Sequence, residues 1–289
     1  MADPIILPNT LLSNFTRAHV TVALGGDGGD ELFAGYPTFL ANRYAKIYEK
    51  IPSVLRERVL EPAIQLLPVN TDYFSLEFKL KQFIKGARYP LPLRHLVWTG
   101  SFDPKELQSL LGHPIKPAEL YSEALHYHAL SEPAQAGNRE LYLYEKLYLQ
   151  DDFLTKVDRA SMACSLEARA PFLDKEIVEW ISPLPYSWKL KRLTMKNLLK
   201  KAMRDKLPKN ILQRSKQGFA IPVAEWIRKD LKEKVFETLQ PAKIKREGFF
   251  DSLFIQRLLK EHHAGQANHH KKLWTLLMFE WWLEEWAKA

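Results

Sequence analysis

The feature that most constrains the fold is a single β-branched run in a chain whose remaining pattern is helical. The sequence His-Val-Thr-Val-Ala-Leu at residues 19–24 predicts a short buried strand over residues 20–24. From residue 37 onward, apolar residues recur at helical spacing almost throughout, with no internal repeat. A parallel-type strand requires neighbouring strands and helices on both faces. One such strand therefore predicts a mostly α-helical chain whose sheet lacks most of its strands.

The predicted strand runs into a loop, residues 25–36, that holds five of the twelve glycines and three carboxylates. Glycine accepts positive φ and lets the backbone approach a ligand closely. Asp30 is predicted to cap a helix whose first amides face this loop. A strand, a glycine loop and a helix start are the usual setting for a nucleotide phosphate in an open α/β sheet.

The carboxylates of this loop change the ligand that we expect. Asp27, Asp30 and Glu31 would repel a bare phosphate, whereas Mg²⁺ bridging carboxylate and polyphosphate oxygens would be held. The simpler alternative is a tight turn with solvated acids. Neither a P-loop nor a dinucleotide fingerprint is present, so the sequence predicts an active-site loop outside both patterns.

Composition restricts the class of protein. Apolar residues make up 46% and charged residues 26% of the 289 residues, which is typical of a globular chain. The single cysteine, Cys164, excludes an intramolecular disulfide, suits a reducing cytoplasm and is interpreted as a small core residue. We expect no signal peptide and no membrane span, because the first residues lack a basic region and no apolar run is long enough. The net charge of +8 favours anionic partners.

A second cluster of charged residues lies within residues 149–174. It predicts a helix that carries Asp158 and Arg159, followed by an extended piece in which Glu167 and Arg169 point to the same side. Surface ion pairing is one explanation for these charges. The small apolar residues around them favour a functional or buried network instead.

A third cluster is basic. Residues 189–216 contain eleven Lys and Arg against one acid, and Thr194 is predicted to cap a helix within them. Lys216 precedes a glycine-containing loop, where it would neutralise charge on a leaving polyphosphate. A solvated basic face and a nucleic-acid site remain alternatives, although no base-stacking aromatics alternate with the cations.

The remaining helical signals are structural. Asp103 followed by Pro104 predicts a helix start, and residues 273–286 predict an aromatic helix that packs in the core or at a subunit contact. Four histidines at residues 262, 263, 269 and 270 lack the cysteine or carboxylate that would complete a metal site. We therefore expect a solvated turn there.

Three motifs together resemble the synthetase domain of glutamine-dependent asparagine synthetases, in the same order. They are residues 24–36 (LGGDGGDELFAGY), residues 158–174 (DRASMACSLEARAPFLD) and residues 216–219 (KQGF). Residues 207–211 and 273–274 also match, so the resemblance covers nearly the whole chain. It implies a single domain over residues 1–289, the C-terminal portion of an α/β adenine-nucleotide-hydrolase-like (ATP pyrophosphatase) synthetase domain. Residues 1–36 would end the nucleotide-binding core, and residues 37–289 would be largely helical.

The resemblance also implies a chemistry. In that family ATP activates the side-chain carboxylate of aspartate as an acyl-adenylate, and ammonia from a separate glutaminase domain attacks it. Carried over to this sequence, Asp30 and Glu31 would bind Mg²⁺, and Lys216 would stabilise charge on the intermediate and on pyrophosphate. The implied residues beside the nucleotide are Gly26, Asp27, Gly28, Asp30 and Glu31, and those near the amino acid are Glu167 and Arg169.

The departures from the family pattern are equally informative. The glutaminase cysteine and the Ser-Gly-Gly-x-Asp-Ser pyrophosphate loop are absent, and Gly25 stands where serine is common. We therefore expect an incomplete fragment that cannot finish the reaction alone, or a split subunit that needs a partner chain. The unpaired strand edge predicts association, including homodimers. A β-lactam-synthetase-like enzyme and a basic anion- or nucleic-acid-binding module remain alternatives.

Overall fold

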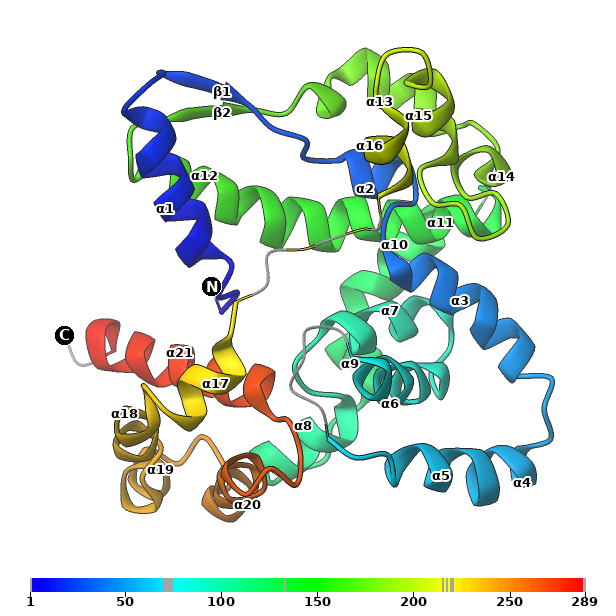
Figure 1. The fold of residues 1–289 in the computed structure, drawn as a ribbon. Coiled ribbons are helices and arrows are strands. Elements are labelled where there is room, and N and C mark those ends of the chain that lie inside the picture. Colours follow the sequence, from blue (N-terminus) through cyan, green and yellow to red (C-terminus); the bar gives the residue numbers. More distant parts are fainter. Residues whose placement is uncertain are drawn as a thin grey trace. The chain divides into compact units, whose positions relative to one another are not determined.

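The computed structural model describes residues 2–69, 75–132, 134–214, 216, 218 and 221–287, which are mostly helical with one small sheet (Figure 1). The mostly helical prediction is confirmed. Parts of the predicted helix at 74–85 and of the KQGF motif lie outside the described residues. None of the helices described is long and apolar enough to cross a lipid bilayer.

The chain divides into two compact units, which we name the loop unit and the helical unit. The loop unit comprises Ile5–Lys46 and Glu123–Phe219, and the helical unit comprises Met1–Pro4, Ile47–Ser122 and Ala220–Ala289. The glycine loop, the predicted strand and the basic segment all belong to the loop unit. All the residues that the sequence predicts for a site therefore lie in one unit.

The loop unit contains short helices and two strands. Its elements are α1 (Ile6–Arg17), β1 (Val22–Leu24), α2 (Gly29–Leu32), α3 (Pro37–Tyr48), α10 (Ser122–Leu130), α11 (Ala136–Leu143), a π-helical segment (Tyr144–Leu154), α12 (Thr155–Met162), β2 (Glu167–Arg169), a 3₁₀ turn (Pro171–Leu173), α13 (Lys175–Ile181), α14 (Tyr186–Lys189), α15 (Asn197–Ala202) and α16 (Lys209–Gln213). Its main core cluster joins Ala34 and Phe39 to Leu141, Tyr144 and Leu190. This cluster anchors the C-terminal end of the glycine loop to α3, α11 and the π-helical segment.

The sheet has two parallel strands among the described residues. β1 pairs with β2 so that Val22 lies opposite Glu167 and Leu24 opposite Arg169. The prediction that Glu167 and Arg169 share one side of an extended piece is confirmed, because alternate residues of a strand project from the same face. The sequence did not identify the pairing of this piece with β1, since Glu-Ala-Arg lacks the β-branched residues typical of a strand.

The glycine loop turns into α2 at Gly28, whose φ is +82°. A Cβ at Gly28 would lie 2.2 Å from Cδ2 of Leu173, so both the backbone conformation and the packing require glycine. The prediction that Asp30 caps this helix is wrong. Gly28 is the cap and Asp30 lies in the first turn, where its carboxylate is free to contact other side chains.

The C-terminal helices of the helical unit pack around one large apolar core. The elements of this unit are α4 (Ser53–Leu55), a π-helical turn (Arg56–Leu60), α5 (Glu61–Gln65), α6 (Leu76–Ala87), α7 (Leu91–Thr99), α8 (Pro104–Leu111), α9 (Pro117–Leu120), α17 (Val223–Arg228), α18 (Lys232–Thr238), α19 (Pro241–Glu247), α20 (Ser252–His263) and α21 (His270–Trp286). The core includes Leu110 of α8, Ile255 of α20, and Leu273 and Leu277 of α21. The predicted aromatic helix at residues 273–286 is thus confirmed as a core helix.

Two local predictions in this unit had opposite outcomes. Asp103 caps α8 as predicted, since its carboxylate accepts from the Glu106 amide while the Glu106 carboxylate accepts from the Asp103 amide. The prediction of a solvated histidine turn is wrong. His262 is fully buried, its Nδ1 accepts from the amide of His269, and its Nε2 lies 3.3 Å from the carbonyl oxygen of Ala224. Both ring nitrogens therefore contact backbone atoms of neighbouring segments rather than solvent.

Candidate functional site

Asp30 is the centre of the candidate site. Its Oδ1 lies 2.8 Å from Nζ of Lys196, and its Oδ2 lies 2.6 Å from Nζ of Lys216, a residue 186 positions away in the sequence. Burial opposes ionisation of this carboxyl, but the hydrogen bonds and charges of the two lysines outweigh burial and hold its pKa below the usual value. The glycine loop and the basic segment therefore meet at one carboxylate.

Lys196 was not singled out from the sequence, and its backbone explains why. Its φ is +53°, a left-handed conformation that non-glycine residues rarely adopt, and its amide donates to the carbonyl of Phe33 at 3.1 Å. The predicted cap of the helix that follows is wrong, because α15 begins at Asn197, and Thr194 instead pairs with Lys191. The left-handed residue turns the chain so that the Lys196 side chain reaches the glycine loop.

Gly35 makes room for this ion pair. A Cβ on Gly35 would lie 2.0 Å from Oδ1 of Asp30 and 2.3 Å from Cε of Lys196. Any larger residue would thus overlap both partners. The last glycine of the loop is explained by this close approach rather than by a turn.

Glu31 and Tyr36 form a second, more buried pair beside Asp30. The Tyr36 hydroxyl donates to Oε1 of Glu31 at 2.6 Å, and Nζ of Lys216 lies 5.5 Å from the centre of the Tyr36 ring. Burial raises the pKa of Glu31 despite the hydrogen bond from Tyr36 and the charge of Lys216, and burial together with Glu31 raises the pKa of Tyr36. Tyr36 also stacks on Tyr144. Lys216 is therefore bounded by a carboxylate and an aromatic face.

Asp27 occupies the open side of the loop. Burial raises its pKa, and the charge of the fully buried Lys156 on α12 partly counteracts this. A Cβ on Gly25 would lie 2.8 Å from Oδ2 of Asp27, whereas one on Gly26 would meet nothing within 4 Å. The loop thus has open space at Gly26, next to the Asp27 carboxylate.

A further pair of titratable groups lies behind Glu31. Lys189 is almost fully buried and donates to the carbonyl of Ser182 at 3.1 Å and to Oδ1 of Asn138 at 3.3 Å. Burial lowers its pKa to about 8, and burial raises the pKa of Glu145 to about 7, with Glu31 adding to that rise. Neither residue could be identified from the sequence, because a lysine among eleven cations gives no sign of being buried.

Glu167 and Arg169, the other predicted site residues, lie on β2 and bond to each other. Nε of Arg169 donates to Oε1 of Glu167 at 2.6 Å, and the two side chains are 63% and 53% exposed. This geometry is surface ion pairing rather than a buried network. Neither residue takes part in the cluster of Asp30, Lys196 and Lys216. Their predicted role near the amino acid stays a prediction.

The donor set does not by itself fit a metal ion. The described part of the chain has no group of three or more His, Cys, Asp or Glu side chains placed to hold a metal. Both carboxylate oxygens of Asp30 face lysines, and Glu31 is buried against Tyr36. Two ammonium groups repel a cation and attract an anion. The arrangement suits a polyphosphate, and Mg²⁺ binding by Asp30 and Glu31 stays a prediction.

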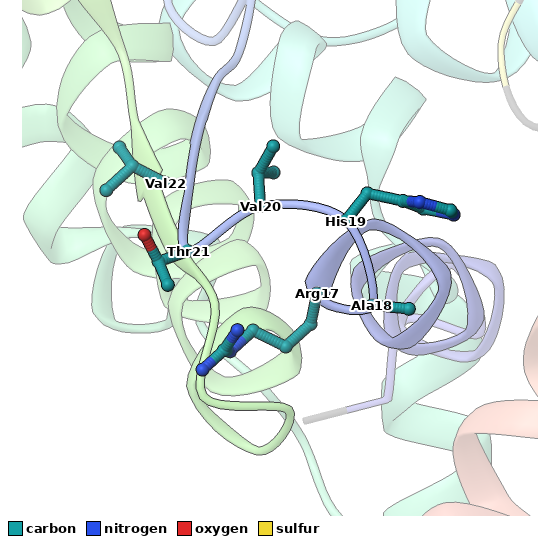
Figure 2. A pocket seen from close by; sticks show the side chains of 6 residues that line it. All are labelled: Arg17, Ala18, His19, Val20, Thr21 and Val22. Atoms are coloured by element: carbon teal, nitrogen blue, oxygen red, sulfur yellow. The ribbon is translucent and has the colours of Figure 1, made fainter.

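The turn between α1 and β1 forms a surface depression lined by residues 17–22 (Figure 2). The side chains of Arg17, His19, Val20 and Val22 point in different directions in Figure 2 and converge on no common point. A ligand site requires a few convergent polar groups. This depression is therefore not the candidate active site.

Comparison with known proteins identifies the family. The model of the family described as asparagine synthase matches residues 1–284. The chain belongs to the asparagine synthase family. It is 31% identical over 283 residues to asparagine synthetase [glutamine-hydrolyzing] 1 of Bacillus subtilis (strain 168), covering 98% of this chain and 43% of that protein. The resemblance stated from the three motifs is confirmed.

Other relatives in this family show the same partial coverage. A putative asparagine synthetase [glutamine-hydrolyzing] of Mycobacterium tuberculosis (strain ATCC 25618 / H37Rv) is 30% identical over 290 residues, covering 98% of this chain and 42% of that protein. The Gallus gallus asparagine synthetase [glutamine-hydrolyzing] is 26% identical over 186 residues, covering 59% of this chain and 31% of that protein. This chain thus spans less than half the length of these asparagine synthetases and corresponds to their C-terminal part.

Proposed function

We propose that this chain supplies the polyphosphate-binding half of an enzyme that makes asparagine from aspartate, ATP and ammonia. One observation carries the proposal: two lysines far apart in the sequence converge on Asp30 of the glycine loop. An acid with two ammonium groups has a net positive charge, and the loop beside it is open at Gly26. Family membership supports ATP and aspartate as the substrates.

The proposed reaction has two steps. The side-chain carboxylate of aspartate attacks the α-phosphorus of ATP, which forms an aspartyl adenylate and releases pyrophosphate. Ammonia then attacks the acyl carbon, so that AMP leaves, a proton is lost and asparagine forms. Ammonia would come from glutamine at a glutaminase domain outside this chain. We place this chemistry in the cytoplasm, because ATP and a single reduced cysteine suit that compartment.

The candidate site residues have proposed parts in this scheme. Lys216 and Lys196 would leave Asp30 to bind the phosphate oxygens and would neutralise the charge that develops as pyrophosphate leaves. Gly26, Asp27 and Gly28 would lie beside the nucleotide, where a side chain at position 26 would obstruct it. Glu167 and Arg169 would contact the amino acid. The list of roles extends the sequence prediction by one residue, Lys196.

In this proposal Mg²⁺ binds to the chain only together with ATP. The described residues offer no complete metal site, so bound metal would require phosphate oxygens and a lysine displaced from Asp30. We expect Mg²⁺ alone, without nucleotide, to show no saturable binding to the chain in titration calorimetry. Millimolar or tighter binding of the metal alone would show that the lysines do not control this carboxylate.

The first experiment measures pyrophosphate and ATP binding to the chain by titration calorimetry without metal. We expect saturable binding, weakened about tenfold by Lys216→Ala and by Lys196→Ala, since each removes one charge contact to phosphate. Lys201→Ala is the matched control, because Lys201 is an exposed lysine at the end of α15. Equal losses in all three variants would mean a diffuse basic surface, and steep salt-dependent binding to DNA would favour the nucleic-acid alternative.

Asp30→Asn gives an independent check of the same site. If Asp30 competes with phosphate for the lysines, the variant should bind metal-free pyrophosphate more tightly, by about tenfold. If Asp30 also binds the metal of ATP, the same variant should bind magnesium-ATP more weakly. A loss of affinity for both ligands would contradict the competition between Asp30 and phosphate.

Catalysis by the isolated chain is a separate question. We expect no asparagine and no pyrophosphate when the chain is incubated with ATP, magnesium, aspartate and ammonia, because it matches under half of its relatives. Product formation would contradict the proposal that the chain is incomplete. A β-lactam-synthetase-like enzyme would instead release pyrophosphate with a carboxylate that carries its own amine, in the absence of ammonia.

A further inference from the structure

The last helix of the helical unit, α21, carries apolar side chains on two opposite sides. One side, with Leu273 and Leu277, lies in the apolar core of the unit. The other side includes Trp282 and Trp286, which are 54% and 71% exposed. A helix that is apolar all round is typically buried all round. The second side of α21 is therefore left uncovered by the described part of the unit.

The uncovered side of α21 is part of a continuous aromatic surface. The Phe279 ring lies 6.2 Å from the Trp282 ring and 5.7 Å from the ring of Phe249, which precedes α20 and is 51% exposed. Trp286 follows Trp282 by four residues and so lies beside it on the helix. We name these four side chains, Phe249, Phe279, Trp282 and Trp286, the aromatic face. Its three exposed rings present on the order of 400 Å² of apolar surface, a patch size that often marks an interaction site.

The aromatic face has a cation at one end and an acid at the other. Arg246 is exposed in the last turn of α19, three residues before Phe249, which contacts Phe279. Glu285 is exposed next to Trp286, about 10 Å further along α21 than Phe279. Among the described residues neither Arg246 nor Glu285 has an ion-pair partner. Opposite charges at the two ends make the surface complementary to itself after a half-turn.

We propose that the aromatic face binds the same face of a second copy of this chain, in a two-fold dimer whose α21 helices are antiparallel. The two-fold axis passes near Trp282. Trp286 of each copy then packs on Phe279 and Phe249 of the other copy. Antiparallel helices also place opposite ends of their dipoles side by side. This inference depends neither on polyphosphate binding at Asp30 nor on the length of the relatives.

The two charges favour a second copy over other occupants. In the two-fold arrangement Arg246 of each copy lies opposite Glu285 of the other, so the dimer contains this pair twice. An anionic lipid surface would instead be repelled at the acidic end of the face. The exposed rings supply about half of the roughly 800 Å² per partner that a stable interface buries. We therefore expect a weak dimer, with a dissociation constant on the order of 30 µM.

Analytical ultracentrifugation of the whole chain, without nucleotide, measures this association. Between about 3 µM and about 300 µM we expect a reversible change from monomer to dimer, weakened at least about tenfold by Trp282→Glu. Leu66→Glu is the matched control and should leave the dimer unchanged, because Leu66 is 84% exposed directly after α5 of the same unit. A chain that is monomeric at about 300 µM would overturn the proposal. So would a dimer that Trp282→Glu leaves intact, or one that both variants weaken equally.

Charge reversal tests how the two copies are arranged. Arg246→Glu and Glu285→Arg should each weaken the dimer about fivefold, because each places two like-charged pairs across the interface. The double variant restores opposite charges at both pairs and should regain the affinity of the parent. Both positions are exposed, so all variants should keep the far-ultraviolet circular dichroism of the parent. A double variant as weak as the single variants would overturn the antiparallel arrangement. Binding to phosphatidylserine vesicles that Trp282→Glu abolishes, with no dimer in solution, would assign the face to a lipid surface instead.

Discussion

The two units each contain a cluster of lysine and carboxylate side chains, and the ratio of the charges differs between them. In the loop unit one carboxylate, Asp30, faces two lysines. In the helical unit one lysine, Lys243, faces Glu280 at 2.9 Å and Glu284 at 2.7 Å. Glu280 is fully buried, whereas Lys216 is 34% exposed at its side chain. The first cluster has spare positive charge within reach of solvent, and the second has its charge enclosed by helices.

This difference separates a binding site from a structural pair. Burial opposes the charge on Lys243, but its hydrogen bonds to Glu284 and Glu280 outweigh burial and raise its pKa. Burial raises the pKa of Glu280, and its hydrogen bond with Glu247 adds to the rise. A buried acid that is paired with a lysine of its own unit needs no ligand. Lys196 and Lys216, by contrast, share one carboxylate, which we propose they exchange for phosphate.

The largest expected effect is on the free energy of unfolding, when the Lys243 cluster of the helical unit is broken. Lys243→Met removes the only lysine that Glu280 contacts among the described residues and should lower the free energy of unfolding by about 3 kcal/mol, because a buried carboxylate is left unpaired. Urea unfolding followed by circular dichroism measures this loss. Lys234→Met is the control, since Lys234 pairs with Glu237 on the surface. If both variants lose the same stability, the Lys243 cluster is no more enclosed than a surface pair.

The next prediction concerns the pH dependence of stability, which depends on His262 and His270 of the helical unit. Burial lowers the pKa of His262 and of His270 to about 4, from 6.5. A base whose pKa is lower in the folded state stabilises the fold above its unfolded pKa, and that stability is lost as the pH falls toward the folded pKa. The free energy of unfolding should therefore fall by about 2 kcal/mol per histidine between pH 6.5 and pH 4.

The matching measurement is urea unfolding at pH 7, 5.5 and 4.5. His262→Gln should lower stability at pH 7 but flatten its dependence on pH, because one titrating group is removed. His113→Asn is the control, as His113 is exposed. A pH dependence unchanged in the His262 variant would place the acid-sensitive group elsewhere.

Gly35→Ala tests the cluster of Asp30, Lys196 and Lys216 by adding one methyl group. The added methyl would overlap both Asp30 and Lys196, and overpacking of this kind costs about 1–3 kcal/mol. Cα of Asp30 would also lie 2.9 Å from the added Cβ and cannot swing aside as a side chain can, so we expect about 2 kcal/mol, the middle of this range, in urea unfolding. Gly112→Ala is a control for strain alone, since Gly112 has positive φ but nothing within 4 Å of an added Cβ.

The sequence predicted the parts of this picture that depend on local pattern. The glycine loop between a strand and a helix, the capped start of α8 at Asp103 and the mostly helical character all follow from residue type and spacing. Lys216 was identified from a glycine-containing loop, and the structure places it on Asp30. These features are set within a few residues of the chain.

The features that the sequence did not predict depend on contacts between distant segments. Lys196 reaches Asp30 because its own backbone is left-handed. Lysine rarely adopts this conformation, so the residue type does not predict it. His262 is buried because α17 and α20 meet at its ring, although the local sequence is polar. β2 forms because β1 is available to pair, not because Glu-Ala-Arg favours a strand.

The smallest effect is expected at the surface pair on β2. Arg169→Gln should change the free energy of unfolding by less than about 1 kcal/mol, because both members of the Arg169–Glu167 pair are exposed and screened. Lys175→Gln, in the exposed pair with Glu179, should change it as little and serves as the control. A large loss would instead mean that this pair is enclosed like the Lys243 cluster.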